Sequence, residues 1–193
     1  DRQGADFFRV IENMEEVLGS DFVPLQIPIG EADSFRGVID LIRMKACIYE
    51  DDLGSDIKIE DIPQDYKEAS EKFRHNIVEK ASTCDESLTE KYVKSPESIT
   101  DDEIVSALRE GTISNKIVPV LCGSALKNKG IQPLLDAVVS YLPSPLDTPS
   151  IEAVSCSDAD KRVELNPFID EPFSALAFKI QSDVHIGKLV YIL

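Results

Sequence analysis

The chain has 193 residues, of which 42% are hydrophobic and 29% are charged, and its formal net charge at pH 7 is −16. These values predict a soluble globular protein with one large domain or two smaller ones. The acidic balance argues against DNA or RNA as a partner, because phosphate backbones bind basic surfaces. A basic protein partner and simple solubility explain the charge equally well. No apolar run is long enough to span a membrane.

Residues that form disulfides or bind metals are few. The chain has two histidines, far apart in sequence, and four cysteines without a CxxC pair. This pattern predicts neither a disulfide framework nor a zinc site, and it fits reduced thiols in the cytosol. We therefore expect a cytoplasmic protein with no metal site. The cysteines are Cys47, Cys84, Cys122 and Cys156.

The first part of the chain predicts a helix followed by strands. Apolar residues recur at helical spacing over residues 5–18, and Gly19 stands where a left-handed C-cap would fall. Alternating apolar residues over 22–30 predict a strand, which Pro24 and Pro28 place at a sheet edge or entry. Strand-like runs follow at 35–49 and 56–62.

The remaining elements are helices, one strand and a proline-rich segment. Helices are predicted over 64–82, over 85–94 and from a capping-box pattern, Thr100 to Glu103, through Leu108. A strand over 117–121 and a helix over 132–142 follow. Residues 143–170 predict an extended connector, and 171–193 predict new strands. The chain lacks an initiator methionine and ends inside an apparent strand, so we expect a segment of a longer protein.

The loop after the 117–121 strand consists of small residues, Gly123, Ser124 and Ala125. Ligands of open α/β sheets bind at the carboxyl ends of strands. Small side chains let backbone N–H groups approach a ligand acceptor closely. By itself this pattern also fits an ordinary tight turn between a strand and a helix.

Several long strings resemble the elongation factor G family of translational GTPases. CGSALKNKGIQPLLDAVVSYLPSP is similar to the last guanine-specificity motif, and DRQGADFFRVIE to the continuation of the Asn-Lys-x-Asp motif. PLQIPIG, FRGVIDLIRMKA, EDIP, YLPSPLDTP and EPFSALAFKI also resemble that family, in the expected order. The resemblance covers almost the whole chain. One departure is His185-Ile186-Gly187-Lys188, where the family pattern usually carries an aromatic residue before the glycine.

The resemblance implies an α/β fold with an α+β insertion. Residues 1–21 and 115–145 would form the C-terminal part of a P-loop-type GTPase domain, and 22–114 an inserted α/β subdomain. Residues 146–170 would be a linker, and 171–193 the first strands of a β-barrel domain. That barrel could not close within these residues, so its strands would have open edges.

The resemblance also implies guanine-binding residues. Asp1 matches the carboxylate that accepts hydrogen bonds from guanine N1–H and the 2-amino group. Ser124 and Ala125 match the loop whose backbone donors face guanine O6, and Leu126 would border the base. As the first residue of this chain, Asp1 is itself expected to be disordered. No catalytic or metal-binding residue is predicted.

The 193 residues contain no G-x-x-x-x-G-K-[ST] phosphate loop. The resemblance implies that the parent protein binds GTP and GDP with Mg²⁺, hydrolyses GTP and drives translocation of tRNA and mRNA on the ribosome. The chain by itself is expected to hydrolyse no GTP, to hold no cofactor and to bind nucleotide weakly or not at all.

The middle block is acidic and resembles the subdomain that docks on the stalk protein of the large ribosomal subunit. Lysines interleave with its carboxylates, so charge alone also fits a merely solvated helix. With the resemblance, we predict a docking surface formed by Glu68, Glu71, Glu79, Glu86 and Glu90.

Two other functions fit parts of the sequence. One is a self-standing acidic protein-binding module without a nucleotide site, which a phosphate loop upstream of Asp1 would exclude. The other is a ribosome-protection or release-type paralogue. The strings ADFFRVIE and PLQIPIG favour the translocation factor over that paralogue.

Overall fold

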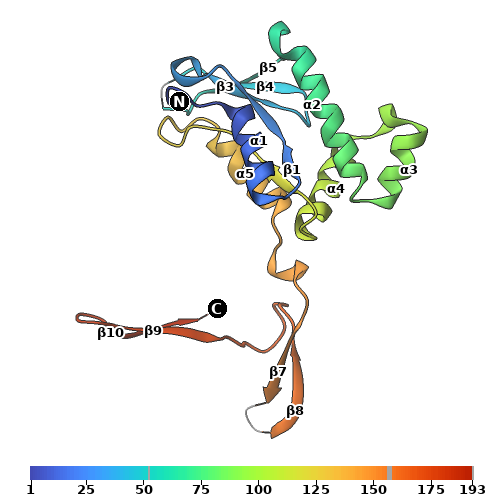
Figure 1. The fold of residues 1–193 in the computed structure, drawn as a ribbon. Coiled ribbons are helices and arrows are strands. Elements are labelled where there is room, and N and C mark those ends of the chain that lie inside the picture. Colours follow the sequence, from blue (N-terminus) through green and yellow to red (C-terminus); the bar gives the residue numbers. More distant parts are fainter. Residues whose placement is uncertain (52, 156–157, 193) are drawn as a thin grey trace. The chain divides into compact units, whose positions relative to one another are not determined.

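The computed structural model describes residues 1–51, 53–155 and 158–192 (Figure 1). The chain divides into two units, Asp1–Leu142 and Pro143–Leu193. The first unit holds the buried core and all the site residues predicted from the sequence.

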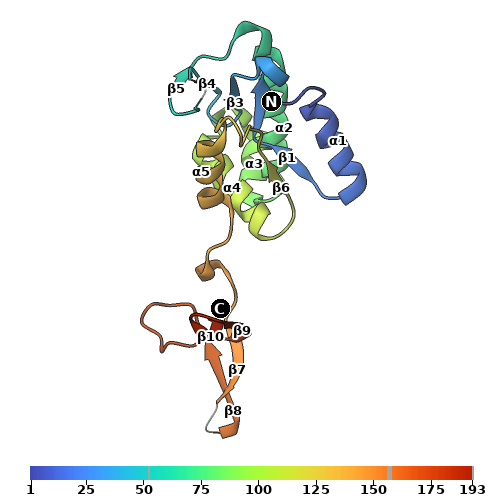
Figure 2. The same ribbon diagram turned by 90° about the vertical axis from the view of Figure 1, so that its left-hand side faces the viewer.

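A parallel pair of strands lies at the centre of the first unit. β1 (Phe22–Pro24) pairs with β6 (Val118–Val120), with Phe22 opposite Val118. Helix α1 (Phe7–Leu18) lies on one side of this pair and α5 (Ile131–Tyr141) on the other (Figure 2). Parallel strands need a long crossover, and here the crossover contains the whole middle block. The predicted α/β class is confirmed.

The 22–30 run forms two strands that belong to different sheets. β1 joins β6, and β2 (Gln26–Ile29) begins a four-stranded antiparallel sheet in the order β2-β3-β4-β5. Both strands of the run lie at sheet edges, as predicted, because proline cannot donate to a ladder. The change of sheet falls at Leu25, inside the range predicted for the insertion.

The 35–49 run, predicted as one strand, is a hairpin. β3 (Gly37–Asp40) pairs with β4 (Lys45–Tyr49), which pairs with β5 (Ile57–Glu60). The carboxylate of Asp40 accepts the N–H groups of Ile42 and Arg43, both at 2.9 Å, and Met44 takes a left-handed φ of 52°. These local bonds turn the chain where the apolar pattern alone predicts continuation.

The predicted helices of the middle block are confirmed, with small differences at their ends. They are α2 (Gln64–Ser82), α3 (Glu86–Lys94) and α4 (Asp101–Ile113). Single 3-10 turns occur in this block at Ala32–Ser34 and Pro96–Ser98, and beyond it at Pro145–Asp147. Thr100 and Glu103 form the predicted capping box. The helices bury apolar faces against the strands; the core includes Val23, Leu25, Ile27, Ile39, Ile77, Leu88, Ile104 and Leu108.

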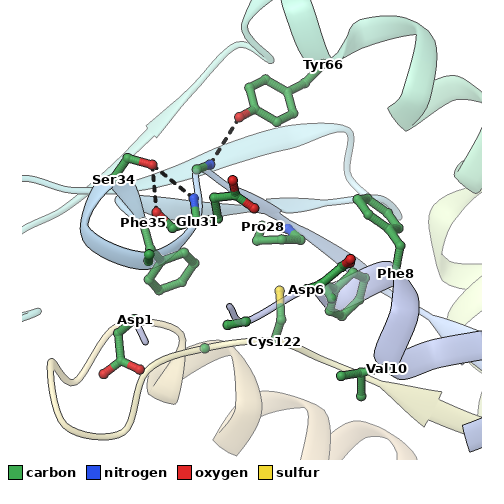
Figure 3. Close-up of a pocket in the computed structure, with 15 residues that line it drawn as sticks. Asp1, Asp6, Phe8, Val10, Pro28, Glu31, Ser34, Phe35, Tyr66 and Cys122 are labelled. Atoms are coloured by element: carbon green, nitrogen blue, oxygen red, sulfur yellow. Dashed lines mark hydrogen bonds between the residues drawn. The ribbon is translucent and has the colours of Figure 1, made fainter. Parts of the chain in front are cut away.

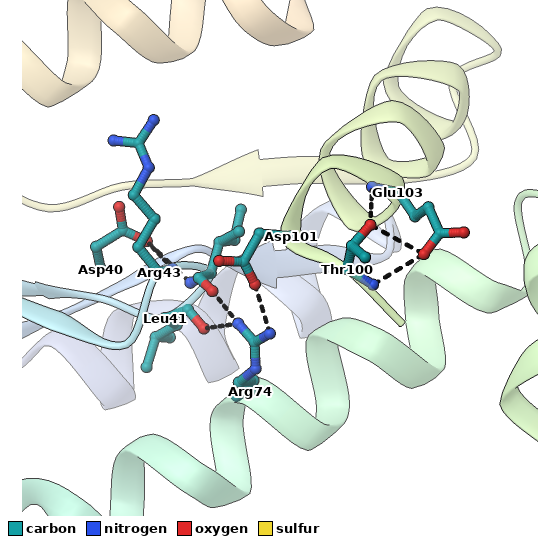
Figure 4. Close-up of polar contacts among 8 residues, drawn as sticks. Asp40, Leu41, Arg43, Arg74, Thr100, Asp101 and Glu103 are labelled. Atoms are coloured by element: carbon teal, nitrogen blue, oxygen red, sulfur yellow. Dashed lines mark hydrogen bonds and ion pairs between the residues drawn. The ribbon is translucent and has the colours of Figure 1, made fainter. Parts of the chain in front are cut away.

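Arg74 ties three elements of this core together (Figure 4). Its guanidinium donates from α2 to the carbonyl oxygens of Leu41 and Ile42 in the β3–β4 turn, and it pairs with Asp101 of α4 at 2.7 Å. Arginine suits this position because its planar fork offers several donors in one plane.

The second unit contains two antiparallel hairpins. β7 (Ile151–Ser155) pairs with β8 (Asp158–Leu165), so part of the predicted 146–170 linker is a hairpin rather than an extended connector. β9 (Ala177–Asp183) pairs with β10 (Gly187–Ile192) around a turn in which Asp183 accepts two backbone N–H groups. The expectation of an extended connector failed over 151–155 and 158–165, because prolines and charges flank hairpins as well as linkers.

Candidate functional site: a carboxylate and a backbone-donor loop

The loop from Cys122 to Gly130 connects β6 to α5 and is closed by its own backbone. The Ser124 N–H donates to the Lys129 carbonyl at 2.8 Å, and the Lys129 N–H donates in return to the Ser124 carbonyl at 3.0 Å. A Cβ on Gly123 would lie 2.7 Å from the Lys129 carbonyl oxygen. Glycine at this position therefore has a packing reason, because no larger residue fits without moving the loop.

Asp1 lies beside this loop. The Ser124 hydroxyl donates to Oδ2 of Asp1 at 2.8 Å, across 123 positions of sequence, and accepts the Lys127 N–H at 3.2 Å. Ser124 is buried, with 3% of its surface exposed. The expectation that Asp1 is disordered is wrong, because this hydrogen bond gives its carboxylate a defined place. The two segments predicted to share a site lie side by side.

The backbone N–H groups of the two residues after Ser124 are free. Among the described residues, no acceptor takes the N–H of Ala125 or of Leu126, and both residues are exposed, Leu126 to 88%. The Ser124 N–H was also predicted to face a ligand, but its bond to Lys129 occupies it. Ser124 thus contributes its hydroxyl, and the N–H groups of Ala125 and Leu126 remain available to a ligand.

A pocket of about 590 Å³ opens next to Asp1 and Gly123 (Figure 3). Side chains of α1 form one wall and the chain after β2 forms another, and the Tyr66 hydroxyl there accepts the Gly30 N–H at 3.1 Å. Burial raises the pKa of the Cys122 thiol at its edge to about 12, so this thiol stays protonated. The apolar lining comprises Phe7, Phe8, Val10, Pro28 and Phe35.

The loop also rests on the hairpin between β4 and β5. The Gly130 N–H donates to the Tyr49 hydroxyl at 2.7 Å, and the side chain of Asn128 donates to the Leu53 carbonyl at 3.1 Å. Sequence reasoning missed this contact, because about 80 residues separate its two sides and neither side carries a recognisable motif.

The five predicted docking carboxylates lie on two helices of the middle block. Glu68, Glu71 and Glu79 recur at helical spacing along α2, and all three are exposed. Glu86 and Glu90 are exposed on α3, where Glu90 forms an ion pair with Lys94 at 3.0 Å. The tyrosine–histidine contact between Tyr92 and His75, at 3.4 Å, joins the two helices.

The described residues contain no cluster of three or more His, Cys, Asp or Glu side chains that could hold a metal ion. Cys47, Cys84 and Cys122 are free thiols, and Cys156 lies outside the described residues. Within the described part of the chain, no helix is long and apolar enough to cross a membrane. The groups placed together at the loop are the Asp1 carboxylate, the Ser124 hydroxyl and the backbone N–H groups of Ala125 and Leu126.

Comparison with known proteins gives concordant matches. Residues 1–144 match the family "Elongation factor Tu GTP binding domain". "Elongation factor G 2" of Syntrophomonas wolfei subsp. wolfei (strain DSM 2245B / Goettingen) is 51% identical over 191 residues, which cover 99% of this chain and 27% of that protein. A crystal structure of a Thermus thermophilus protein matches 98% of this chain and 25% of its own, with a TM-score of 0.74 and 25% identity. The chain thus spans about a quarter of the length of either relative.

Proposed function

The chain belongs to the elongation factor Tu GTP binding domain family, and from this premise we propose that it reads the guanine base of GTP and GDP within a longer translational GTPase similar to elongation factor G. The observation that carries the proposal is the hydrogen bond between Asp1 and Ser124 beside two free backbone amides. It joins both segments that the sequence predicts for guanine recognition.

The hydrogen-bonding groups of this site complement guanine. Guanine offers two donors, N1–H and the 2-amino group, which suit the acceptor-only carboxylate of Asp1. It offers one acceptor, O6, which suits the N–H groups of Ala125 and Leu126. The Ser124 hydroxyl holds the Asp1 carboxylate in place by donating to Oδ2.

Adenine presents the opposite pattern and is disfavoured. Its 6-amino group would face the amide donors of the loop, and it has no N1–H for the carboxylate. Each polar group left buried without a partner costs about 1–3 kcal/mol. Two such mismatches suffice for discrimination by at least an order of magnitude between the two bases, since each 1.4 kcal/mol is about tenfold.

The activity of the whole factor is part of the proposal. We infer that it binds GTP with Mg²⁺, hydrolyses it in the cytoplasm and drives movement of tRNA and mRNA through the ribosome. The 51% identity to a protein named elongation factor G 2 supports this assignment. Within that factor, the part we assign to this chain is to hold and select the base, through Asp1 and the loop after Ser124.

A second part of the proposal concerns α2 and α3. We propose that Glu68, Glu71, Glu79, Glu86 and Glu90 dock on the stalk protein of the large ribosomal subunit. Their exposure and helical spacing support an acidic surface on these two helices, which fits a basic partner. Surface carboxylates of this kind accelerate association through long-range attraction more than they add affinity.

The guanine-reading role is tested by changing which groups Asp1 presents. In the whole factor, Asp1→Asn replaces one carboxylate acceptor by an amide donor, so we expect GDP affinity to fall at least tenfold. Xanthosine diphosphate carries a carbonyl in place of the 2-amino group, and its affinity should rise. Equilibrium titration of both nucleotides measures the two changes. Equal weakening of both, or unchanged GDP binding, would contradict the proposal.

A ribosome-protection or release-type paralogue would share the same base site. The two roles differ in what nucleotide hydrolysis accomplishes. A single-round translocation assay with the whole factor and programmed ribosomes separates them: the translocation factor advances the mRNA by one codon, and the paralogues do not. The family match over residues 1–144 disfavours the self-standing acidic module.

A further inference from the structure

We propose that the tip of the β4–β5 hairpin, formed by Tyr49, Leu53 and Gly54, positions the loop that faces guanine O6 and so sets its preference for a 6-oxo purine. This inference rests on the proposed function and deepens it, because it assigns a selectivity role to residues that do not touch the nucleotide. The three residues are called the hairpin tip below.

Two hydrogen bonds join the hairpin tip to the loop, and a third joins it to α5. The Tyr49 hydroxyl accepts the Gly130 N–H at 2.7 Å, in a buried position. The Leu53 carbonyl accepts from the Asn128 side chain at 3.1 Å, and the Gly54 carbonyl accepts from the Gln132 side chain at 3.0 Å. Together they hold the loop's last residues and the first turn of α5.

The Gly54 contact is close enough to exclude a side chain. Gly54 has a φ of +66°, and a Cβ there would lie 2.3 Å from the Asn128 carbonyl oxygen. Asn128 is itself left-handed, with a φ of 51°. Two left-handed backbones in direct contact leave the loop little freedom to shift, because displacement of one requires movement of the other.

Tyr49 is suited to a fixed supporting role. Only 3% of its surface is exposed, and burial raises the pKa of its hydroxyl, which therefore stays neutral. Loss of this hydroxyl would leave the Gly130 N–H buried without an acceptor. Gly130 has a φ of 86° and is the N-cap of α5. The bond to Tyr49 therefore holds the residue at which the loop backbone turns into the helix.

The free amides of Ala125 and Leu126 lie between two anchored points. At one end, Ser124 is held by Lys129 and Asp1; at the other, Asn128 and Gly130 are held by the hairpin tip. A recognition donor must be held within a fraction of an ångström of its acceptor to discriminate. The hairpin tip adds to the loop's own backbone bonds, which include one from the Asn128 N–H to the Ala125 carbonyl at 3.2 Å.

A matched pair of glycine substitutions in the whole factor tests the inference. Gly54→Ala places a methyl group against Asn128, whereas Gly19→Ala, with a similar φ of +63°, places one in open space. Both variants carry similar backbone strain, so their difference reports the contact. The readout is the ratio of dissociation constants for 2,6-diaminopurine riboside diphosphate and for GDP. The first base has a 6-amino group in place of O6 and a bare N1 in place of N1–H; since neither variant changes Asp1, which faces N1, a change in the ratio reports the loop that faces position 6.

We expect Gly54→Ala to weaken GDP binding and lower this ratio, each by about tenfold, because displaced donors lose O6 and no longer oppose the 6-amino group. Gly19→Ala should leave both unchanged. The preference for GDP over inosine diphosphate, which lacks the 2-amino group read by Asp1, should be unchanged in both. A purely structural role of the contact would lower the melting temperature while leaving the ratios equal, and that result would overturn the inference.

Tyr49→Phe covers the case in which Gly54→Ala does not fold, since it deletes only the hydroxyl that accepts the Gly130 N–H. The same fall in the 6-oxo preference is expected, and an unchanged preference would overturn the inference. If the unmodified factor binds GDP and ADP equally, the proposed function fails instead. The two failures are therefore distinguishable.

Discussion

At the scale of single residues, Glu103 shows how a surface carboxylate acquires a structural role (Figure 4). Its side chain accepts hydrogen bonds from the Thr100 N–H at 2.8 Å, from the Thr100 hydroxyl at 2.9 Å and from Lys91 at 2.7 Å. The Lys91 bond is the main cause that lowers the pKa of Glu103 from 4.5 to about 2, and the Thr100 bonds follow. The ionised form is thus favoured in the folded protein.

A depressed pKa predicts a definite pH dependence. Because the folded pKa lies below the unfolded one, Glu103 stabilises the fold above about pH 4.5 and loses that contribution as the pH falls towards about 2. Urea unfolding of Glu103→Gln should therefore differ from the parent at pH 6 and converge with it near pH 2. Glu90→Gln, which breaks the exposed pair with Lys94, should show little difference at any pH. A constant gap for Glu103→Gln would contradict this assignment.

At the scale of elements, the amphipathic helix α2 performs two tasks. Ile77 and Ala81 are buried in the core, while Glu68, Glu71 and Glu79 are exposed on the other side. Its neighbour α3 buries Leu88 and exposes Glu86 and Glu90. Helical periodicity thus separates the residues that stabilise the subdomain from those available to a partner.

The docking proposal predicts where a partner perturbs the chain. On addition of the stalk protein's C-terminal domain, amide NMR signals of α2 and α3 should shift, and the shifts should weaken with added salt. Glu71→Lys should reduce the effect, and Glu12→Lys on α1, an exposed glutamate outside the acidic surface, should not. Shifts confined to other elements would contradict the proposal.

At the scale of the whole chain, the proposed guanine-binding residues, called the base half-site below, occur in 193 residues that contain no phosphate loop. A charged phosphate cradle supplies much of the affinity of GTPases for nucleotide, through backbone N–H groups and a lysine. The contacts of the base alone amount to a few hydrogen bonds, each with a net value of about 0.5–1.5 kcal/mol. Under the proposed function, base selectivity and most of the nucleotide affinity would therefore come from different parts of the whole factor.

This division predicts that the 193-residue chain binds GDP no more tightly than about 1 mM, which corresponds to about −4 kcal/mol. Isothermal titration or NMR titration with GDP measures this limit, and the whole factor under the same conditions serves as the control. Micromolar affinity of the chain by itself would show that the base half-site carries more of the binding energy than its hydrogen bonds account for.

Local patterns predicted most elements of the fold. Gly19 caps α1 in the left-handed conformation, and the Thr100–Glu103 box starts α4, as the sequence indicates. These features depend on residues within one turn of each other, so the sequence contains all that is needed. Two predictions failed, the single strand over 35–49 and the 143–170 connector. In both regions the chain reverses direction and forms a hairpin, which the local pattern did not indicate.

The sequence by itself determined the residue types of the candidate site and the family that they resemble. Only the tertiary structure decided that Asp1 meets Ser124, that the Ser124 amide is already occupied, and that the hairpin tip supports the loop. The physical reason is the distance along the sequence over which each interaction acts. Propensity and capping act between neighbours in sequence, whereas a hydrogen bond across 123 positions forms only after the packed strands and helices bring its partners together.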